Sequence, residues 1–272
     1  MITKEQLYEY GIEYKGRWTH EIKAICPKCS TSRKKKTEPC LSINTENGVF
    51  VCHHCEWSGK VKDKKMREKA IHYTKPEYNQ TELSDKILKY FEGRGISQKV
   101  VISNKITEQS VYMPQVQGNR NAIRFNYFRD GECVNVKYRD SEKNFKQVAG
   151  AEKVFYGLDD IKDTDTVIIV EGEFDKLSFD ELGLDFCVSV PDGAPNANAK
   201  NVEAKFSYLD NCYKYFENKV KIYIAVDNDA NGRRLLDELS RRLGRDRVWI
   251  IGFPDDCKDA NDVLIKYGAE KL

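Results

Sequence analysis

The sequence has no apolar run long enough for a membrane-spanning helix. Such a helix needs about 18 or more consecutive apolar residues, whereas the apolar stretches here are short and strand-like, as in Thr166–Val170. The first residues, Met1 to Gly11, are charged and lack the apolar core of a signal peptide. The chain also lacks an internal repeat of fixed period. We therefore expect a cytoplasmic globular protein with no membrane partner.

The net charge of +2 is small, but the charges are unevenly distributed along the chain. Residues 1–82 contain 16 Lys and Arg against 11 Asp and Glu, whereas the remainder contains 29 against 32. Two basic clusters dominate the first part, Arg33–Lys36 and Lys60–Lys75. Such clusters favour contact with a phosphate backbone, although charge alone fits a solvated linker equally well.

Four of the nine cysteines form two Cys-x-x-Cys pairs, Cys26–Cys29 and Cys52–Cys55, with 22 residues between them. Each pair can place two thiolates on one ion, so the pairs predict a tetrahedral Zn²⁺ site in a zinc ribbon. Because four cysteines close the site, we expect the zinc to be structural. His53 and His54 lie between two ligands, and we interpret them as surface residues. The other five cysteines read as small core residues, since cytosolic disulfides are rare: Cys40, Cys133, Cys187, Cys212 and Cys257.

The residue pattern divides the chain into four segments. We expect a zinc ribbon over 1–60 and a polar, Lys-rich linker over 61–82. Residues 83–164 contain alternating strand-like stretches and the hairpin signal Asp130-Gly131, which predict a small α+β, largely antiparallel subdomain. Residues 165–272 alternate strands and helices, which predicts an α/β domain with a mostly parallel sheet.

The expected strands of the last segment are Thr166–Val170, Phe186–Val190, Val220–Val226 and Val248–Gly252. One uninterrupted helix is expected over Val202–Asn218, between the second and third of these strands. Other helices are expected at Phe174–Gly183, Asn231–Leu243 and Ala260–Tyr267.

Acidic residues cluster after three of these strands, at Glu171–Glu173, Asp227–Asp229 and Asp259–Asp262. The carboxyl ends of parallel strands meet at one edge of the sheet. Carboxylates that converge there repel each other unless a cation lies between them, and Mg²⁺ prefers such oxygen ligands. Any single acid could instead cap a helix, as Asp175 and Asp259 could. Three clusters together favour a divalent-metal site for phosphoryl transfer.

These clusters resemble the signature of the TOPRIM domain, which primases, topoisomerases, some nucleases and recombination-mediator proteins share. The matching strings are Val-Glu-Gly-Glu at 170–173, Asp-Asn-Asp at 227–229 and Lys-Asp-Ala-Asn-Asp at 258–262. Together with the zinc ribbon and the segment from Val136 to Lys146, nearly the whole chain is similar to the primase half of phage-type, Twinkle-like primase–helicases. The resemblance implies a DNA primase of a bacterial or phage-infected cell, which makes short RNA primers on single-stranded DNA.

The resemblance also implies roles for single residues. Glu171 is expected to act as a metal-associated general base, with Asp227 and Asp229 as further catalytic residues. The same three carboxylates and Asp259 are expected to hold Mg²⁺ or Mn²⁺.

Lys137 and Lys143 match lysines of the family that contact the nucleotide or the growing primer. Arg139 and Lys146 are weaker candidates nearby. The alternative for these basic side chains is a salt-bridged strand surface.

The expected partners are single-stranded DNA, ribonucleoside triphosphates, a replicative helicase and a DNA polymerase. The sequence has no Gly-x-x-x-x-Gly-Lys-Ser/Thr loop and thus no helicase motor, which leaves a free-standing primase or a fragment of a primase–helicase open. The ribbon has Val49–Val51 where the family can place a histidine, so the template sequence is not predicted. Two other functions stay open: a TOPRIM nuclease, and a non-catalytic DNA-binding adaptor.

Overall fold

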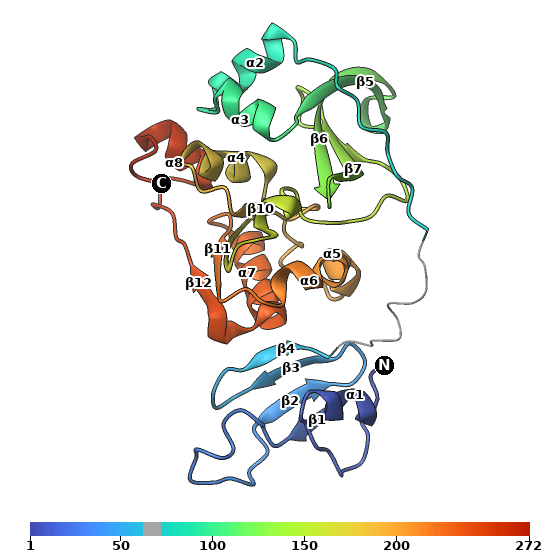
Figure 1. The fold of residues 1–272 in the computed structure, drawn as a ribbon, viewed down its shortest axis with the longest axis vertical. Helices are drawn as coiled ribbons and strands as arrows, with labels where there is room; N and C mark the ends of the chain where they lie inside the picture. The colour runs from blue at the N-terminus through green and yellow to red at the C-terminus, as the bar shows by residue number, and fades with distance from the viewer. Residues whose placement is uncertain (62–71) are drawn as a thin grey trace. The chain divides into compact units, whose positions relative to one another are not determined.

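The computed structural model describes residues 1–61 and 72–272, so much of the expected linker lies outside the described residues. The described residues form two compact units (Figure 1). One contains the residues up to 61 together with Leu235–Val248, and the other contains His72–Arg234 together with Trp249–Leu272. No helix in the described ranges is long and apolar enough to cross a membrane.

The N-terminal residues form the predicted antiparallel ribbon. Helix α1 (Lys4–Glu9) precedes a sheet of order β1-β2-β3-β4. Leu7, Ile43 and Phe50 are buried in its core, where the Phe50 ring packs against Trp57 at 4.6 Å between centroids. Gly59 lies inside β4. The strand bounds are Glu21–Ala24, Leu41–Asn44, Val49–Cys52 and Ser58–Lys60.

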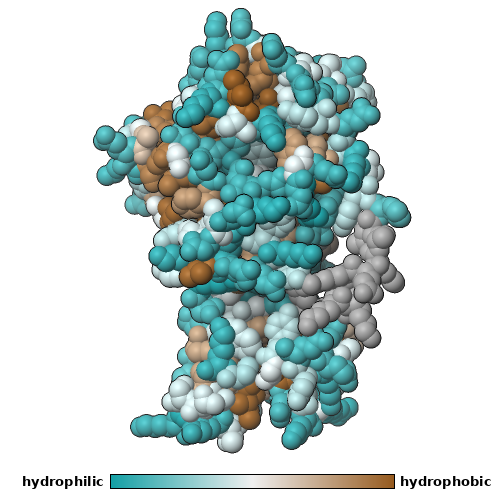
Figure 2. All heavy atoms as spheres, viewed as in Figure 1, coloured by the Kyte–Doolittle hydropathy of each residue, from teal (hydrophilic) through white to brown (hydrophobic). Residues whose placement is uncertain are grey.

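The next part of the chain forms the expected antiparallel sheet, with strand order β5-β6-β7-β8. Asp130 and Gly131 both have left-handed φ angles, 50° and 79°, which two-residue hairpin turns require. This turn joins β6 to β7 and thereby fixes their register. Apolar side chains gather on the surface over the preceding helices α2 and α3 (Figure 2), and Ile102 of α3 is 65% exposed. The bounds are α2 Asp85–Glu92, α3 Gln98–Ser103, β5 Thr107–Met113, β6 Gly118–Arg129, β7 Glu132–Arg139 and β8 Phe145–Gln147.

The remaining strands form the predicted four-stranded parallel sheet, of order β10-β9-β11-β12. The central strand β9 pairs in parallel with both β10 and β11. Helix α4 packs on β9, β10 and α8. The bounds are β9 Thr166–Val170, α4 Glu173–Glu181, β10 Cys187–Ser189, β11 Lys221–Ala225, α7 Ala230–Leu243, β12 Val248–Ile250 and α8 Ala260–Tyr267.

The single helix expected over Val202–Asn218 is wrong. The chain forms a 3₁₀ turn and two short helices, α5 (Ser207–Asn211) and α6 (Tyr213–Phe216). Tyr208 and Phe216 both pack against the Phe155 ring, at 4.8 and 4.9 Å between centroids. In a continuous helix these two residues would stand roughly 12 Å apart along the axis. The break therefore lets both aromatic rings reach one neighbour.

Candidate active site and zinc centre

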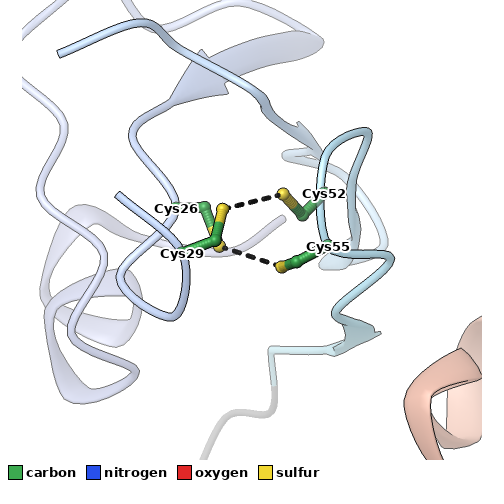
Figure 3. A group of neighbouring side chains, drawn as sticks. All are labelled: Cys26, Cys29, Cys52 and Cys55. Atoms are coloured by element: carbon green, nitrogen blue, oxygen red, sulfur yellow. Dashed lines mark hydrogen bonds between the residues drawn. The ribbon is translucent and has the colours of Figure 1, made fainter. Parts of the chain in front are cut away.

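The four predicted zinc ligands converge at one point of the ribbon (Figure 3). The sulfur atoms of Cys26 and Cys55 are 3.8 Å apart, and those of Cys29 and Cys52 are 3.7 Å apart. All four Sγ atoms lie within 4.8 Å of one another. A zinc ion with four Zn–S bonds of about 2.3 Å holds its sulfur atoms roughly 3.8 Å apart. The geometry thus fits a tetrahedral ion, and the predicted four-cysteine zinc site is confirmed.

A fifth cysteine lies beside this site. The Sγ atom of Cys40 is 3.5 Å from that of Cys52 and 4.0 Å from that of Cys29. The sequence placed Cys40 in the core, but its side chain is half-buried at the edge of the zinc ligands. His53 contacts Ser42, with 2.9 Å between Nε2 and Oγ, and is not part of the cysteine ligand set.

The second unit contains a cavity of about 810 Å³ at the carboxyl edge of the parallel sheet. One wall carries carboxylates that follow β9, β10 and β11, and the facing wall comes from β7, β8 and the segment after them. Acidic and basic side chains thus share one open space. The charged lining residues are Lys137, Lys146, Lys153, Glu171, Glu173, Asp175, Asp192, Asp227, Lys258 and Asp259.

Glu171 stands directly after β9, and the next residue, Gly172, is the N-cap of α4. Its Oε1 atom accepts a hydrogen bond of 3.0 Å from the backbone N–H of Ala194. Its Oε2 atom is buried and has no hydrogen-bond partner among the described residues. Burial, and next the charge of Asp227, raise the pKa of the Glu171 carboxyl above its ordinary value. An orphaned, buried carboxylate oxygen beside further acids is the kind of ligand that a divalent cation satisfies.

Burial and mutual repulsion also act on the neighbouring acids. Burial, followed by the charges of Asp259 and Asp227, raises the pKa of Asp175 well above its ordinary value. Burial likewise raises the pKa of Asp227, although Lys258 opposes the shift from 2.7 Å. Converging carboxylates with raised pKa values are typical of a site that binds Mg²⁺ or Mn²⁺.

The cavity brings together many of the predicted site residues. Glu171, Asp227 and Asp259 lie in its lining, and so do Lys137 and Lys146 on the opposite wall. Asp259 also caps α8, because its side chain accepts a hydrogen bond from the backbone N–H of Asp262. Its two readings from the sequence, helix cap and site residue, are thus compatible.

Three predicted residues lie outside the lining. Asp229 lies 4.0 Å from the lining residue Lys258, and its Oδ1 accepts hydrogen bonds of 2.9 Å from the backbone N–H groups of the first turn of α7. The Arg139 guanidinium is buried between aromatic rings, 4.9 Å from the centroid of Phe174. Lys143 is exposed in the turn between β7 and β8, with a φ of 64°.

Sequence reasoning missed three acidic residues of the lining, Glu173, Asp175 and Asp192. Asp175 was read as a helix cap, and it does accept a hydrogen bond of 3.2 Å from the backbone N–H of Gly172. Its other oxygen accepts a bond from the N–H of Asn261, which ties α4 to α8 beside the cavity. Glu173 pairs with Lys137 at 2.8 Å. The spacing of Glu171, Glu173 and Asp175 across the turn from β9 into α4 was the available signal.

Comparison with known proteins agrees with this geometry. Residues 168–264 match the family model described as Toprim-like. A "Primase homolog protein" of Arabidopsis thaliana is 39% identical over 201 residues, which are 70% of this chain and 58% of the relative. The "Twinkle homolog protein, chloroplastic/mitochondrial" of the same plant is also 39% identical over 201 residues, but these are only 28% of its length. The chain therefore spans only part of the relatives that it matches.

Solved structures show the same fold. The primase fragment of the bacteriophage T7 primase-helicase protein superposes with a TM-score of 0.57 at 20% identity, over 92% of this chain and 97% of that fragment. The zinc-binding and RNA polymerase domains of the Aquifex aeolicus primase give a TM-score of 0.54 at 16% identity, over 98% of this chain and 80% of that one. With its four-cysteine zinc site and Toprim domain, the chain belongs to the family of primase domains found in T7- and Twinkle-type primase–helicases.

Proposed function

We propose that this protein is a DNA primase, which synthesises short RNA primers on single-stranded DNA by metal-assisted nucleotidyl transfer. The observation that supports this best is the cavity in which acids and lysines face each other. Glu171, Asp175 and Asp227 form an acidic edge suited to divalent cations, and Lys137 and Lys146 suit the negative charge of a triphosphate. A nucleoside triphosphate that binds with a divalent cation needs both the acidic edge, which holds the cation, and the lysines, which contact the phosphates.

We propose that Glu171 and Asp227, with Asp229 and Asp259 beside them, hold the divalent ions, because the Oε2 atom of Glu171 has no partner among the described residues. When bound, Mg²⁺ or Mn²⁺ neutralises developing charge on the phosphates and orients the attacking oxygen. Asp175 was not predicted to be a ligand, but its place in the lining makes it a further candidate.

In the proposed reaction, Glu171 accepts the proton from the 3′-hydroxyl of one nucleotide, directly or through a water. Its raised pKa suits this role, because a general base works best when its pKa is near the working pH. The 3′-oxygen forms a bond to the α-phosphorus of the second nucleotide, and the bond to pyrophosphate breaks. Lys137 and Lys146 stabilise the charge of the triphosphate, since cations bound to phosphate oxygens make strong hydrogen bonds.

We propose that the zinc ribbon (1–60) and the basic linker (61–82) bind the template, and that residues 83–164 and 165–272 form the catalytic part. The ribbon carries the basic cluster Arg33–Lys36, which suits phosphate contacts. A solved T7 complex has primase domains bound to an RNA/DNA hybrid and interacting with the lagging-strand DNA polymerase. By analogy, we expect this protein to act with a replicative helicase and a polymerase.

The test is a primer-synthesis assay on a library of single-stranded templates, with labelled ribonucleoside triphosphates and Mg²⁺ or Mn²⁺. We expect short RNA from the wild type and none from Asp227→Ala, whose binding to single-stranded DNA should persist. Sequencing the templates that were used would identify the recognised sequence. DNA shortened without added nucleotides would instead identify a nuclease. DNA binding with neither product would identify an adaptor.

A further inference from the structure

Two side chains of the antiparallel sheet reach one carboxylate oxygen at the cavity wall. The hydroxyl of Tyr127, on β6, donates a hydrogen bond of 2.5 Å to Oε1 of Glu173. The ammonium of Lys137, on β7, lies 2.8 Å from the same oxygen. Lys137 pairs with Phe125 across the two strands, and Tyr127 is two residues further along β6, so both side chains project from one face of the sheet.

Tyr127 and Glu173 are buried, and Lys137 is largely buried. The side chains of Lys137 and Glu173 are 11% and 5% exposed, and Tyr127 is fully buried. Burying an ion pair has a desolvation cost that its attraction often fails to repay. The buried ion pair of Lys137 and Glu173 would therefore add little to the stability of the fold. The pair is better explained if the ammonium must be held at one position in the cavity wall.

Lys137 retains donors for a ligand. An ammonium group has three N–H donors, and the structure gives Lys137 one hydrogen-bond acceptor among the described residues, Glu173. The residue itself lines the cavity. Its ammonium can therefore bind an anionic oxygen there while Glu173 fixes its position.

The tyrosine in turn fixes the carboxylate. Burial, and next the charge of Glu173, raise the pKa of Tyr127 well above its ordinary value, so its hydroxyl keeps the proton that it donates. Because Tyr127 and Lys137 donate to the same oxygen, loss of the hydroxyl would let the carboxylate rotate and the ammonium move with it.

We propose that Tyr127 is a positioning residue, which acts through Glu173 to hold the Lys137 ammonium against the phosphates of a bound ribonucleoside triphosphate. The inference rests on the proposed function for the identity of the ligand. In this proposal Glu173 orients Lys137 and is not a ligand of the divalent metal, although it stands in the same acidic turn as Glu171.

The test is a double-mutant cycle on the full chain, with Tyr127→Phe, Lys137→Met and the double variant. The affinity for a fluorescent ribonucleoside triphosphate is measured in Mg²⁺ without template, so that no catalysis is needed. Tyr127→Phe should weaken binding by about five- to tenfold in the wild-type background, as expected for lost support of a charged hydrogen bond. In the Lys137→Met background the same change should have less than about a twofold effect.

Tyr156→Phe is the matched control, because Tyr156 is equally buried and its ring packs against Tyr127 at 5.2 Å between centroids. Its hydroxyl donates to the backbone oxygen of Asn104 and not to Glu173. This control should leave nucleotide affinity unchanged, and melting temperatures would show that all variants fold.

Three results would overturn the inference. They are an equal loss of affinity from Tyr127→Phe in both backgrounds, a similar loss from Tyr156→Phe, and wild-type affinity in Lys137→Met. Each could occur in a protein that makes RNA primers and would then leave primer synthesis as the proposed function, although wild-type affinity in Lys137→Met would remove Lys137 from the proposed triphosphate contacts. A wild type that synthesises no RNA and binds no nucleotide would contradict the proposed function itself.

Discussion

Lys176 gives the sharpest prediction on stability, because it is a buried cation in the helix that carries Glu173 and Asp175. Its side chain is 2% exposed, and its ammonium lies 2.6 Å from Asp180 and 2.8 Å from Asp160. Burial disfavours its charge, but the two carboxylates outweigh burial and hold the pKa of Lys176 above its ordinary value. The lysine is therefore charged, and replacing it with methionine leaves both carboxylates without their cation.

The two carboxylates contribute unequally to the expected loss. The side chain of Asp180 is 6% exposed and cannot recover its hydration, whereas that of Asp160 is 40% exposed and can. Removing one partner of a buried ion pair costs about 3–5 kcal/mol, and we assign most of this to Asp180. Lys176 belongs to the unit formed by His72–Arg234 and Trp249–Leu272. For a domain of about 150–250 residues, that loss lowers the melting temperature by roughly 6–20 °C. Replacing both charges, in Lys176→Met/Asp180→Asn, should restore the free energy of unfolding to within about 2 kcal/mol of the wild type.

Thermal unfolding followed by circular dichroism, together with urea unfolding, measures both variants against the wild type. A Lys176→Met variant that melts within about 2 °C of the wild type would refute the reasoning, since even a 1 kcal/mol loss moves the midpoint that far. If Lys176→Met/Asp180→Asn is as unstable as Lys176→Met, the loss comes from poor packing of the methionine and not from an unpaired charge on Asp180.

Three further predictions concern the metal sites and the cavity. We expect atomic absorption to find one zinc ion per wild-type chain and none in Cys52→Ser. The ribbon should then unfold, because binding of a structural zinc contributes about 10–16 kcal/mol to such folds. Zinc retained by Cys52→Ser would contradict this. Asp227→Asn should raise the melting temperature of the metal-free protein at neutral pH and abolish most of the further rise that Mg²⁺ gives the wild type. The pKa values of Glu171 and Asp227 are raised in the metal-free folded protein. These two carboxyls therefore stabilise the metal-free fold when the pH is below the ordinary carboxyl pKa. This stabilisation is lost as the pH rises through their raised pKa values. A metal-induced rise that survives in Asp227→Asn would contradict it. Lys146→Ala should raise the KM for nucleotides several-fold more than Lys143→Ala, because only Lys146 lines the cavity; equal effects in steady-state kinetics would refute this placement.

The zinc site and the parallel sheet were predictable because their signals are local. The Cys-x-x-Cys spacing defines two tight turns that each place two thiolates on one ion. The apolar run Val167–Val170 is buried in β9, and an acidic residue follows it directly. Such patterns depend only on residues that are close in the sequence, and the structure contains both the cysteine turns and the buried strand.

The parts that were missed depend on contacts between distant residues. The break at Cys212 follows from two rings that share Phe155, which no pattern within residues 202–218 reveals. The packing of Arg139 against three aromatic side chains was not visible in the sequence either: Tyr90, Phe145 and Phe174. The contacts of Glu173 were hidden for the same reason, because its partners Tyr127 and Lys137 are more than 35 residues away in the sequence.

The most direct test of the central claim is to measure the first phosphodiester bond. Wild-type protein, Mg²⁺, a recognised single-stranded template and two ribonucleoside triphosphates should give a dinucleotide with a 5′-triphosphate and an equal amount of pyrophosphate. Asp227→Ala should give neither product. Pyrophosphate without a dinucleotide, or DNA fragments formed without any nucleotide, would contradict primer synthesis as the function of this cavity.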